Sequence, residues 1–184
     1  MKKKDGFTMI ELLVTIIVFG VLASIAIPGF SRWLPNYRLK GAARDVYSNL
    51  QLAKMGAVKD RGEWAVVFDT GNNRYQLVSS GADGAYGTGG DDVVEKTITL
   101  TNYESGIGYG HGNATEKAGT STDPIDDDIS FTADTVVFNS RGMINSNAGG
   151  YVYIQNDKNG SFAIGVWSTG LIVLRKWQNN DWQQ

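Results

Sequence analysis

Two groups near the start of the chain could act together: the carboxylate of Glu11 and the peptide bond between Gly6 and Phe7. Glu11 interrupts an apolar stretch, 7–27, where a carboxylate costs roughly 2.5–3.5 kcal/mol if the stretch enters a membrane. A cut after Gly6 would create a cationic amine on Phe7, about one helical turn from Glu11. The amine of a neighbouring chain could instead meet Glu11 in a filament. A carboxylate that reaches the headgroups at the membrane edge is the alternative.

The apolar stretch has the length of a membrane-spanning helix. Its 21 residues would extend about 31 Å as a helix, close to the ~30 Å of a bilayer core. Lys2, Lys3 and Lys4 precede it and no cation lies within it, so the N-terminus is expected in the cytoplasm and the remainder outside. No Ala-x-Ala site follows the stretch, and a cut at Gly6 would retain the helix, unlike the cut of a secretory signal.

Composition argues against several other functions. The chain has no cysteine and a single histidine, His111, which excludes disulfides, thiolate zinc sites and a His-based triad with visible partners. The net charge of −2 is unlike that of a dedicated nucleic-acid binder. No nucleophile–base pair, metal cluster or phosphate loop is recognisable, so the sequence predicts no enzyme and no small-molecule substrate.

The run Gly6-Phe7-Thr8-Met9-Ile10-Glu11 resembles the processing site of type IV pilins and type II secretion pseudopilins. That family has a basic leader, a glycine, Phe-Thr-x-x-Glu and an apolar helix. Pro28 stands where the family often places a helix-bending proline, and a kink is expected there.

The resemblance implies a processing and assembly pathway. A prepilin peptidase would cut after Gly6 and methylate the new amine of Phe7. The subunit would lie in the bacterial inner membrane as a single-pass protein, with its C-terminal domain in the periplasm or outside the cell. An assembly ATPase and a platform protein would extract it into a filament with other pilin or pseudopilin subunits, and Glu11 would guide docking.

Beyond the apolar stretch, apolar residues recur every three or four positions from Leu39 to Ala57, which predicts an amphipathic helix. Pro35 is predicted to end one helix, with another beginning near Asn36, and Gly62 is predicted as the stop. The period then changes to two. Strands are expected at 64–68, 75–79, 93–101, 136–138, 150–155, 162–167 and 171–177.

These patterns predict an α+β fold in which a long N-terminal helix packs on an antiparallel β-sheet domain, as in pilins. The expected division is a leader at 1–6, a transmembrane and filament-core helix at 7–28, an amphipathic helix at 29–61, and an extracytoplasmic β-rich domain at 62–184. The segments 136–142 and 168–172 resemble the C-terminal pattern of H-type minor pseudopilins and FimT-type minor pilins. Ordinary turn chemistry, with Gly142 at a positive φ and Arg141 beside it, is the simpler interpretation.

Three further segments are weaker candidates. Asp83, Asp91 and Asp92 in a Gly/Asp-rich loop could offer oxygens to Ca²⁺, although a solvated turn is favoured and no other cofactor is expected. Arg175 and Lys176 beside Trp177 could contact single-stranded nucleic acid, although packing of the tryptophan on the sheet is favoured. The polar segment 103–128 could present a partner-binding surface or be a mobile connection.

The sequence therefore predicts a structural subunit, of minor type, in a type IV pilus or a type II secretion pseudopilus. A DNA-binding minor pilin of natural transformation is the alternative on the same scaffold.

Overall fold

The structure, a computed structural model, describes residues 7–119, 123–145 and 149–183. The predicted leader and Gly6 lie outside these residues, as does the side chain of Pro28. Contacts within the chain divide it into two units, Met1–Leu34 and Pro35–Gln184, which are described separately.

A single helix, α1, runs from Met9 to Asp60 through both units, so the predicted break at Pro35 is wrong. A proline removes one helical hydrogen bond and crowds the carbonyl four residues earlier. Pro35 is buried, and its packing offsets this local cost. The kink expected near Pro28 stays a prediction.

In the first unit, the apolar side chains of α1 have no cover from the chain itself. Leu12, Ile16 and Leu22 are 56%, 63% and 57% exposed, and every residue from 7 to 27 is exposed. The hydroxyls of Thr15 and Ser24 each donate a 2.7 Å hydrogen bond to a helix carbonyl three residues back. The helix is long and apolar enough to cross a membrane.

In the second unit, α1 buries one stripe of mostly small side chains. The buried apolar residues are Leu39, Ala42, Ala43, Val46, Leu50, Ala53 and Ala57. Four alanines let strands approach the helix closely, and the larger side chains fill the gaps between them. The helix ends at Asp60, one residue before the predicted 61, and Arg61, rather than the predicted stop Gly62, adopts the left-handed conformation there.

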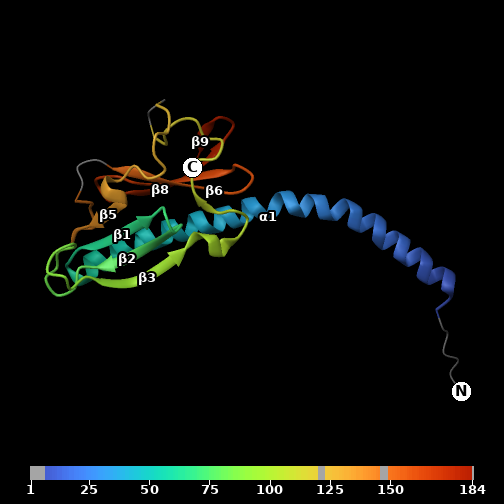
Figure 1. Cartoon of the computed structure of the whole chain (residues 1–184), viewed down its shortest axis with the longest axis horizontal. Helices are drawn as coiled ribbons and strands as arrows, with labels where there is room; N and C mark the ends of the chain where they lie inside the picture. Colours follow the sequence, from blue (N-terminus) through green and yellow to red (C-terminus); the bar gives the residue numbers. More distant parts are fainter. Residues whose placement is uncertain (1–6, 120–122, 146–148, 184) are drawn as a thin grey trace, which may run out of the picture. The chain divides into compact units, whose positions relative to one another are not determined.

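Among the described residues, nine strands form two antiparallel sheets, and Figure 1 shows their arrangement. The four-stranded sheet, sheet A, has the order β3 (Val93–Thr99), β2 (Arg74–Ser79), β1 (Trp64–Asp69) and β5 (Thr135–Phe138). The five-stranded sheet, sheet B, has the order β4 (Gly108–Tyr109), β6 (Gly150–Gln155), β7 (Ser161–Val166), β8 (Ile172–Gln178) and β9 (Asp181–Gln183). Two 3-10 turns, Leu100–Tyr103 and Thr132–Asp134, complete the unit.

All seven predicted strands are confirmed within one or two residues, but they divide between two sheets. The short strands β4 and β9 were missed. The main core lies between α1 and the inner faces of both sheets, where Leu50 of α1 shares one cluster with Val66 of sheet A and Ile164 of sheet B. A second cluster, on the outer face of sheet B, contains Tyr153, Trp182 and Ala118. The long polar segment 103–128 therefore contributes buried residues as well as loop.

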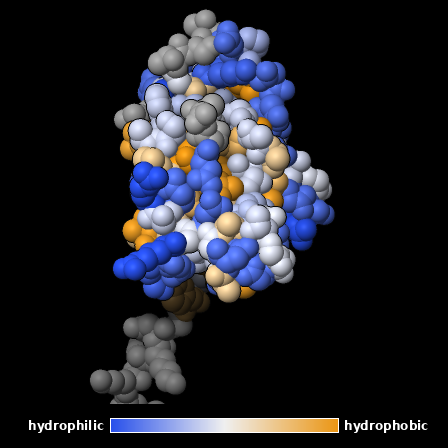
Figure 2. All heavy atoms as spheres, turned by 90° about the vertical axis from the view of Figure 1, so that its left-hand side faces the viewer, coloured by the Kyte–Doolittle hydropathy of each residue, from blue (hydrophilic) through white to orange (hydrophobic). Residues whose placement is uncertain are grey.

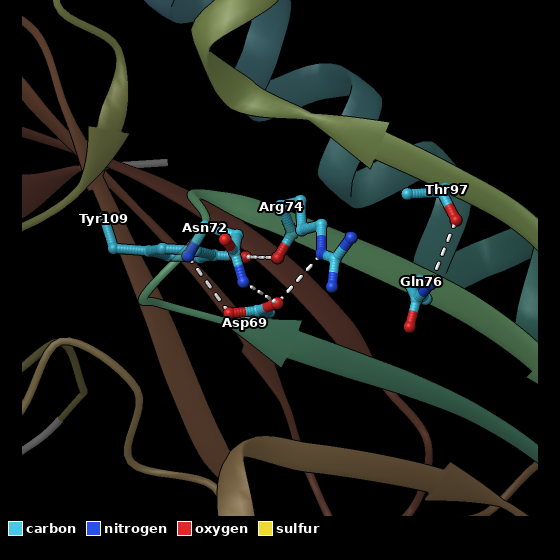
Figure 3. Close-up of polar contacts among 6 residues, drawn as sticks. All are labelled: Asp69, Asn72, Arg74, Gln76, Thr97 and Tyr109. Carbon is cyan, nitrogen blue, oxygen red and sulfur yellow. Dashed lines mark hydrogen bonds and ion pairs between the residues drawn. The ribbon is translucent and has the colours of Figure 1, made fainter.

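The β1–β2 hairpin is linked to sheet B by polar contacts (Figure 3). Asp69 accepts hydrogen bonds from Asn72 and, at 2.8 Å, from the guanidinium of Arg74. These hydrogen bonds, that of Asn72 first, lower the pKa of Asp69. The hydroxyl of Tyr109, on β4, donates a 2.7 Å hydrogen bond to the carbonyl of Arg74. Burial raises the pKa of Tyr109, so it stays protonated as a donor between the two sheets.

Candidate functional site

The start of α1 holds the carboxylate of Glu11 against Thr8. The backbone N–H of Glu11 donates to Thr8 Oγ1 (3.3 Å), and the Thr8 hydroxyl donates to Glu11 Oε2 (3.4 Å). Thr8 immediately precedes the helix and Glu11 is its third residue, which is the spacing of a capping box. Thr8 was missed as a positioning residue in the sequence, although the Thr-x-x-Glu spacing carries the signal.

The first described residues, at the start of α1, are exposed. Phe7 is 80% exposed and Met9 is 89% exposed. The negative side chain of Glu11 also lies in the first turn of α1, where the helix dipole stabilises an anion. A protein that binds the start of α1 can therefore reach the exposed carboxylate of Glu11.

A second feature lies near the C-terminal end of α1, where the turns that contain Gly142 and Gly170 pack against the helix and against each other. Gly142 and Gly170 have φ values of +73° and +76°, and a Cβ on Gly170 would lie 1.9 Å from the carbonyl oxygen of Gly142. Lys54 of α1 donates a 2.8 Å hydrogen bond to the carbonyl of Gly170. The positive φ predicted for Gly142 is confirmed, and this conformation favours glycine. At Gly170, the close approach of the two turns also leaves no room for a side chain.

Asn139 organises the first of these turns. Its Oδ1 accepts the N–H groups of Arg141 (2.9 Å) and Met143 (3.2 Å), and its carbonyl accepts that of Gly142 (2.8 Å). Arg141 is exposed on the tip of the turn. The two segments singled out in the sequence, 136–142 and 168–172, are thus brought together beside α1.

Comparison with known proteins finds one family model for each of these two regions. The family model described as type II transport protein GspH matches residues 42–170, which include most of the helix stripe and the glycines of both stacked turns. The chain belongs to the GspH family. A second model, the prokaryotic N-terminal methylation motif, matches residues 1–27 of this GspH-family chain.

This GspH-family chain is similar in sequence to a fimbrial protein and similar in structure to solved minor pilins and pseudopilins. Fimbrial protein EcpC of Eikenella corrodens is 32% identical over 130 residues, covering 65% of this chain and 77% of that protein. The type IV minor pilin FimU of Pseudomonas aeruginosa is 13% identical with a TM-score of 0.52, covering 79% of this chain and 98% of FimU. The minor pseudopilin EpsH of the Vibrio cholerae type 2 secretion system is 14% identical with a TM-score of 0.49, covering 74% and 95%.

The family decides the class of function. This GspH-family chain is a membrane-anchored structural subunit of the minor pilin and pseudopilin kind, belonging to a type IV pilus or a type II secretion system, and it assembles with other subunits of that kind. The fold prediction, a long helix followed by antiparallel sheet, is confirmed by both the structure and the likeness to FimU.

In this GspH-family chain, carboxylates of the Gly/Asp-rich loop that were candidates for binding Ca²⁺ accept hydrogen bonds from the backbone of the same loop. Oδ2 of Asp91 accepts the N–H groups of Ala82 (2.6 Å) and Asp83 (3.1 Å), and Asp92 accepts that of Gly87 (2.9 Å). Among the described residues, no group of three His, Cys, Asp or Glu side chains could hold a metal ion. Oδ1 of Asp91 and Oδ1 of Asp92 are buried without a hydrogen-bond partner in the part of the chain that the structure describes, and the Ca²⁺ interpretation stays a prediction.

Arg175 and Lys176 do not form one basic patch. Adjacent residues of a strand point to opposite faces, and the Lys176 ammonium contacts Gln178 (3.4 Å). The rings of Trp177 and Trp182 pack edge to face, 5.2 Å apart, and Trp182 is buried against Tyr153. These rings belong to the second core cluster, so they do not offer a platform for stacking bases.

Proposed function

We propose that this subunit is processed between Gly6 and Phe7 and then enters a filament through the first unit of α1. The observation that carries the proposal is the apolar stretch 7–27, whose residues are all exposed in the single chain. Apolar surface on this scale requires cover from lipid or from other chains. A membrane covers it before assembly, and helices of neighbouring subunits cover it afterwards.

The partners of this pathway follow from the same proposal. A prepilin peptidase removes residues 1–6 and methylates the Phe7 amine. The chain spans the inner membrane once with its N-terminus in the cytoplasm, in keeping with Lys2, Lys3 and Lys4 on that side. A platform protein accepts the subunit, Pro28 bends the helix, and residues 62–184 lie outside the cytoplasm.

Glu11 has a defined role in this proposal. The methylated amine of an adjoining subunit neutralises its carboxylate, which relieves the cost of an ion in an apolar helix bundle. Thr8 holds the carboxylate near the helix start until the partner arrives.

Mass spectrometry of the chain from its native membranes tests the processing step. We expect a product that begins at Phe7 and carries one added methyl group, and Gly6→Leu should leave residues 1–6 in place. A product that begins at Met1, or one cut beyond Pro28, would contradict the proposal.

The role of Glu11 is tested with Glu11→Gln, which keeps the size of the side chain and removes its charge. We expect normal processing and membrane insertion but a loss of the subunit from sheared filaments. Glu95→Gln, an exposed acid on β3, is the matched control and should assemble normally. Equal recovery of both variants in filaments would exclude the proposed charge pairing.

A further inference from the structure

Aromatic and basic residues gather on α1 directly after its apolar stretch. Phe30, Trp33 and Tyr37 are 60%, 54% and 60% exposed, and the rings of Phe30 and Trp33 lie 6.2 Å apart. Residues 28–44 also contain four cations and no carboxylate, and the cations are Arg32, Arg38, Lys40 and Arg44. Exposed aromatic side chains at the end of an apolar helix are typical of the interface between hydrocarbon and water. This part of α1 therefore has the composition of a segment at a membrane surface.

Three of these cations line a hollow on α1, which has a volume of about 240 Å³. Its lining residues are Tyr37, Arg38, Lys40, Gly41, Arg44 and Tyr103. A Cβ at Gly41 would meet nothing within 4 Å, so the space over this glycine is open. Lys40 and Arg44 are exposed, and their spacing of one helical turn puts them on the same face, where like charges repel each other. An anion bound between them would offset this repulsion.

The carboxylates nearest to the hollow already have partners of their own. Glu104 forms a 2.5 Å ion pair with Arg38, and Asp45 accepts a hydrogen bond from the hydroxyl of Tyr103. Within the part of the chain that the structure describes, the other two cations of the hollow, at positions 40 and 44, have no hydrogen-bond or ion-pair partner. The charges that the fold leaves uncompensated at this place are therefore positive.

The direction of the side chains brings these two cations toward the apolar stretch. Each Cα–Cβ bond of an α-helix tilts toward the N-terminus of the helix, and long basic side chains extend toward the headgroups. Lys40 follows Trp33 by about two helical turns, ~10 Å of rise. The headgroup region of a bilayer adds about 5–7 Å to each side of the hydrocarbon core. With Trp33 in the interface, the ammonium of Lys40 therefore reaches the headgroups, and Arg44 lies one turn beyond it.

The rest of the second unit has the opposite charge. Residues 62–184 contain seven Lys or Arg and fifteen Asp or Glu. At the far end of α1, Lys59 lies beside Asp60 (3.9 Å), and Figure 2 shows that end of the second unit, where apolar residues are set among hydrophilic ones. Within a Debye length, ~10 Å at 0.1 M salt, an anionic membrane surface attracts residues 28–44 and repels the acidic β-rich part. The charge of the chain is thus complementary to anionic lipid at this segment.

We propose that the hollow over Gly41 binds the phosphate of an anionic phospholipid in the leaflet where the apolar stretch of α1 ends. Lys40 and Arg44 contact the phosphate, and Trp33 lies at the depth of the headgroups. A lipid is the occupant rather than free phosphate, because the membrane anchor keeps lipids close to the hollow at a high effective concentration. The contact holds the subunit in the membrane before assembly and is lost when the subunit leaves the lipid. It depends on the membrane anchor and not on the cut after Gly6.

Native mass spectrometry of the full chain in mild detergent measures lipid binding directly. We expect one phosphatidylglycerol to be retained per chain, and little phosphatidylcholine. The double variant Lys40→Gln, Arg44→Gln should raise the apparent Kd for phosphatidylglycerol about 20- to 30-fold, because each cation near an anionic surface contributes about fivefold. The matched control Lys158→Gln, Lys176→Gln makes the same change in charge at two other exposed positions and should leave the Kd unchanged. Equal retention of the two lipids, or equal losses in the two double variants, would overturn the proposal.

Spin labels in vesicles locate the bound lipid, because the chain has no cysteine of its own and the space over Gly41 is open. One full-length variant carries a labelled Gly41→Cys, and a second carries a labelled Ser48→Cys, an exposed position about two turns further along α1. When part of the phosphatidylcholine is replaced by phosphatidylglycerol, collisions of a neutral nickel complex with the label should become severalfold rarer at Gly41→Cys and stay unchanged at Ser48→Cys. Unchanged collisions at both positions, or equal decreases at both, would contradict binding at the hollow.

The same labelled variant separates a lipid from other anions. Inorganic phosphate added to vesicles of pure phosphatidylcholine should leave the label at Gly41→Cys accessible, and protection by phosphate alone would overturn the choice of a lipid. Protection in native membranes without protection in phosphatidylglycerol vesicles would indicate an acidic protein and would overturn it equally. The processing step is read independently, from the N-terminal mass of the native sample, so failure of lipid binding and failure of the proposed function give different results.

Discussion

The two units contain parts of one helix that use apolar residues in opposite ways. Before Leu34, α1 is apolar on all sides and exposes every residue from 7 to 27. After Pro35, α1 buries one apolar stripe that both sheets cover. A continuous helix can therefore bury apolar side chains of one part within the chain and leave those of the other part to be covered by lipid or neighbouring subunits. The apolar stripe determines how the helix packs on the two sheets. The segment that is apolar on all sides indicates that the helix lies in a membrane or among other apolar helices.

The largest expected difference is between two leucine truncations on the same helix. Leu50→Ala removes a fully buried side chain of the main core and should lower the free energy of unfolding by about 2–5 kcal/mol. Leu13→Ala removes a side chain that is 53% exposed and should change the stability of the second unit by less than about 0.5 kcal/mol. Denaturant unfolding of the full chain in detergent, followed by tryptophan fluorescence, measures both. Similar losses would mean that the two parts of α1 do not differ as described.

The stacked turns allow a sharper test within the second unit. Gly170→Ala would place its Cβ 1.9 Å from the Gly142 carbonyl oxygen, whereas Gly84→Ala, at nearly the same φ (+75°), meets nothing within 4 Å. Both variants bear the strain of a left-handed residue, about 1–3 kcal/mol. Gly170→Ala should be less stable than Gly84→Ala by at least about 1 kcal/mol, because it also separates the turns. Thermal unfolding of the pair checks this, and equal stabilities would exclude a structural need for the close approach.

A buried hydrogen-bonded link between α1 and sheet A should contribute somewhat less to the free energy of unfolding than the features above. Asn49 donates to Tyr75 Oη (2.8 Å) and to the Asp45 carbonyl (2.8 Å), and its Oδ1 accepts from Lys96 (3.0 Å). Asn49→Ala leaves the buried Tyr75 hydroxyl without this donor and should cost about 1–3 kcal/mol. The exposed neighbour Ser48→Ala should cost nothing measurable in the same unfolding experiment. A neutral Asn49→Ala would mean that water replaces the amide.

Alkaline pH should lower the stability of the second unit but not the helicity of the first. Burial is the main cause that raises the pKa of Tyr75, Tyr103 and Tyr109 in the folded chain. Since the unfolded value is about 10, the folded state keeps these protons longer, and its stability is complete below pH ~10 and falls as the pH rises further. Unfolding midpoints between pH ~9 and ~11 should decline for the second unit, while the helical signal of residues 9–34 persists. Tyr109→Phe should flatten the decline, and a midpoint independent of pH would contradict the assignment.

The same contrast explains what the sequence could predict. The 3–4 spacing after Leu39 and the alternation after Trp64 report directly on burial, so the helix stripe and seven strands were found. The continuity of α1 through Pro35 was not predicted. The local cost of a proline within a helix is offset by the burial of Pro35, which depends on tertiary structure. Two-residue β4 and three-residue β9 are too short for a periodic signal. The stacking of Gly142 on Gly170 depends on residues 28 positions apart, which local pattern cannot relate.

The smallest expected effect tests whether Thr8 prepares Glu11 for its partner. Thr8→Ala removes the helix cap and the hydroxyl that donates to the Glu11 carboxylate, and loss of a cap costs about 1 kcal/mol locally. Amide exchange at residues 9–12 should therefore accelerate about fivefold in micelles. Thr15→Ala is the matched control, because its hydroxyl donates only to the Leu12 carbonyl within the helix, and it should leave this exchange unchanged. If both variants behave alike, Thr8 does not order the start of α1, and Glu11 must be positioned by the neighbouring subunit alone.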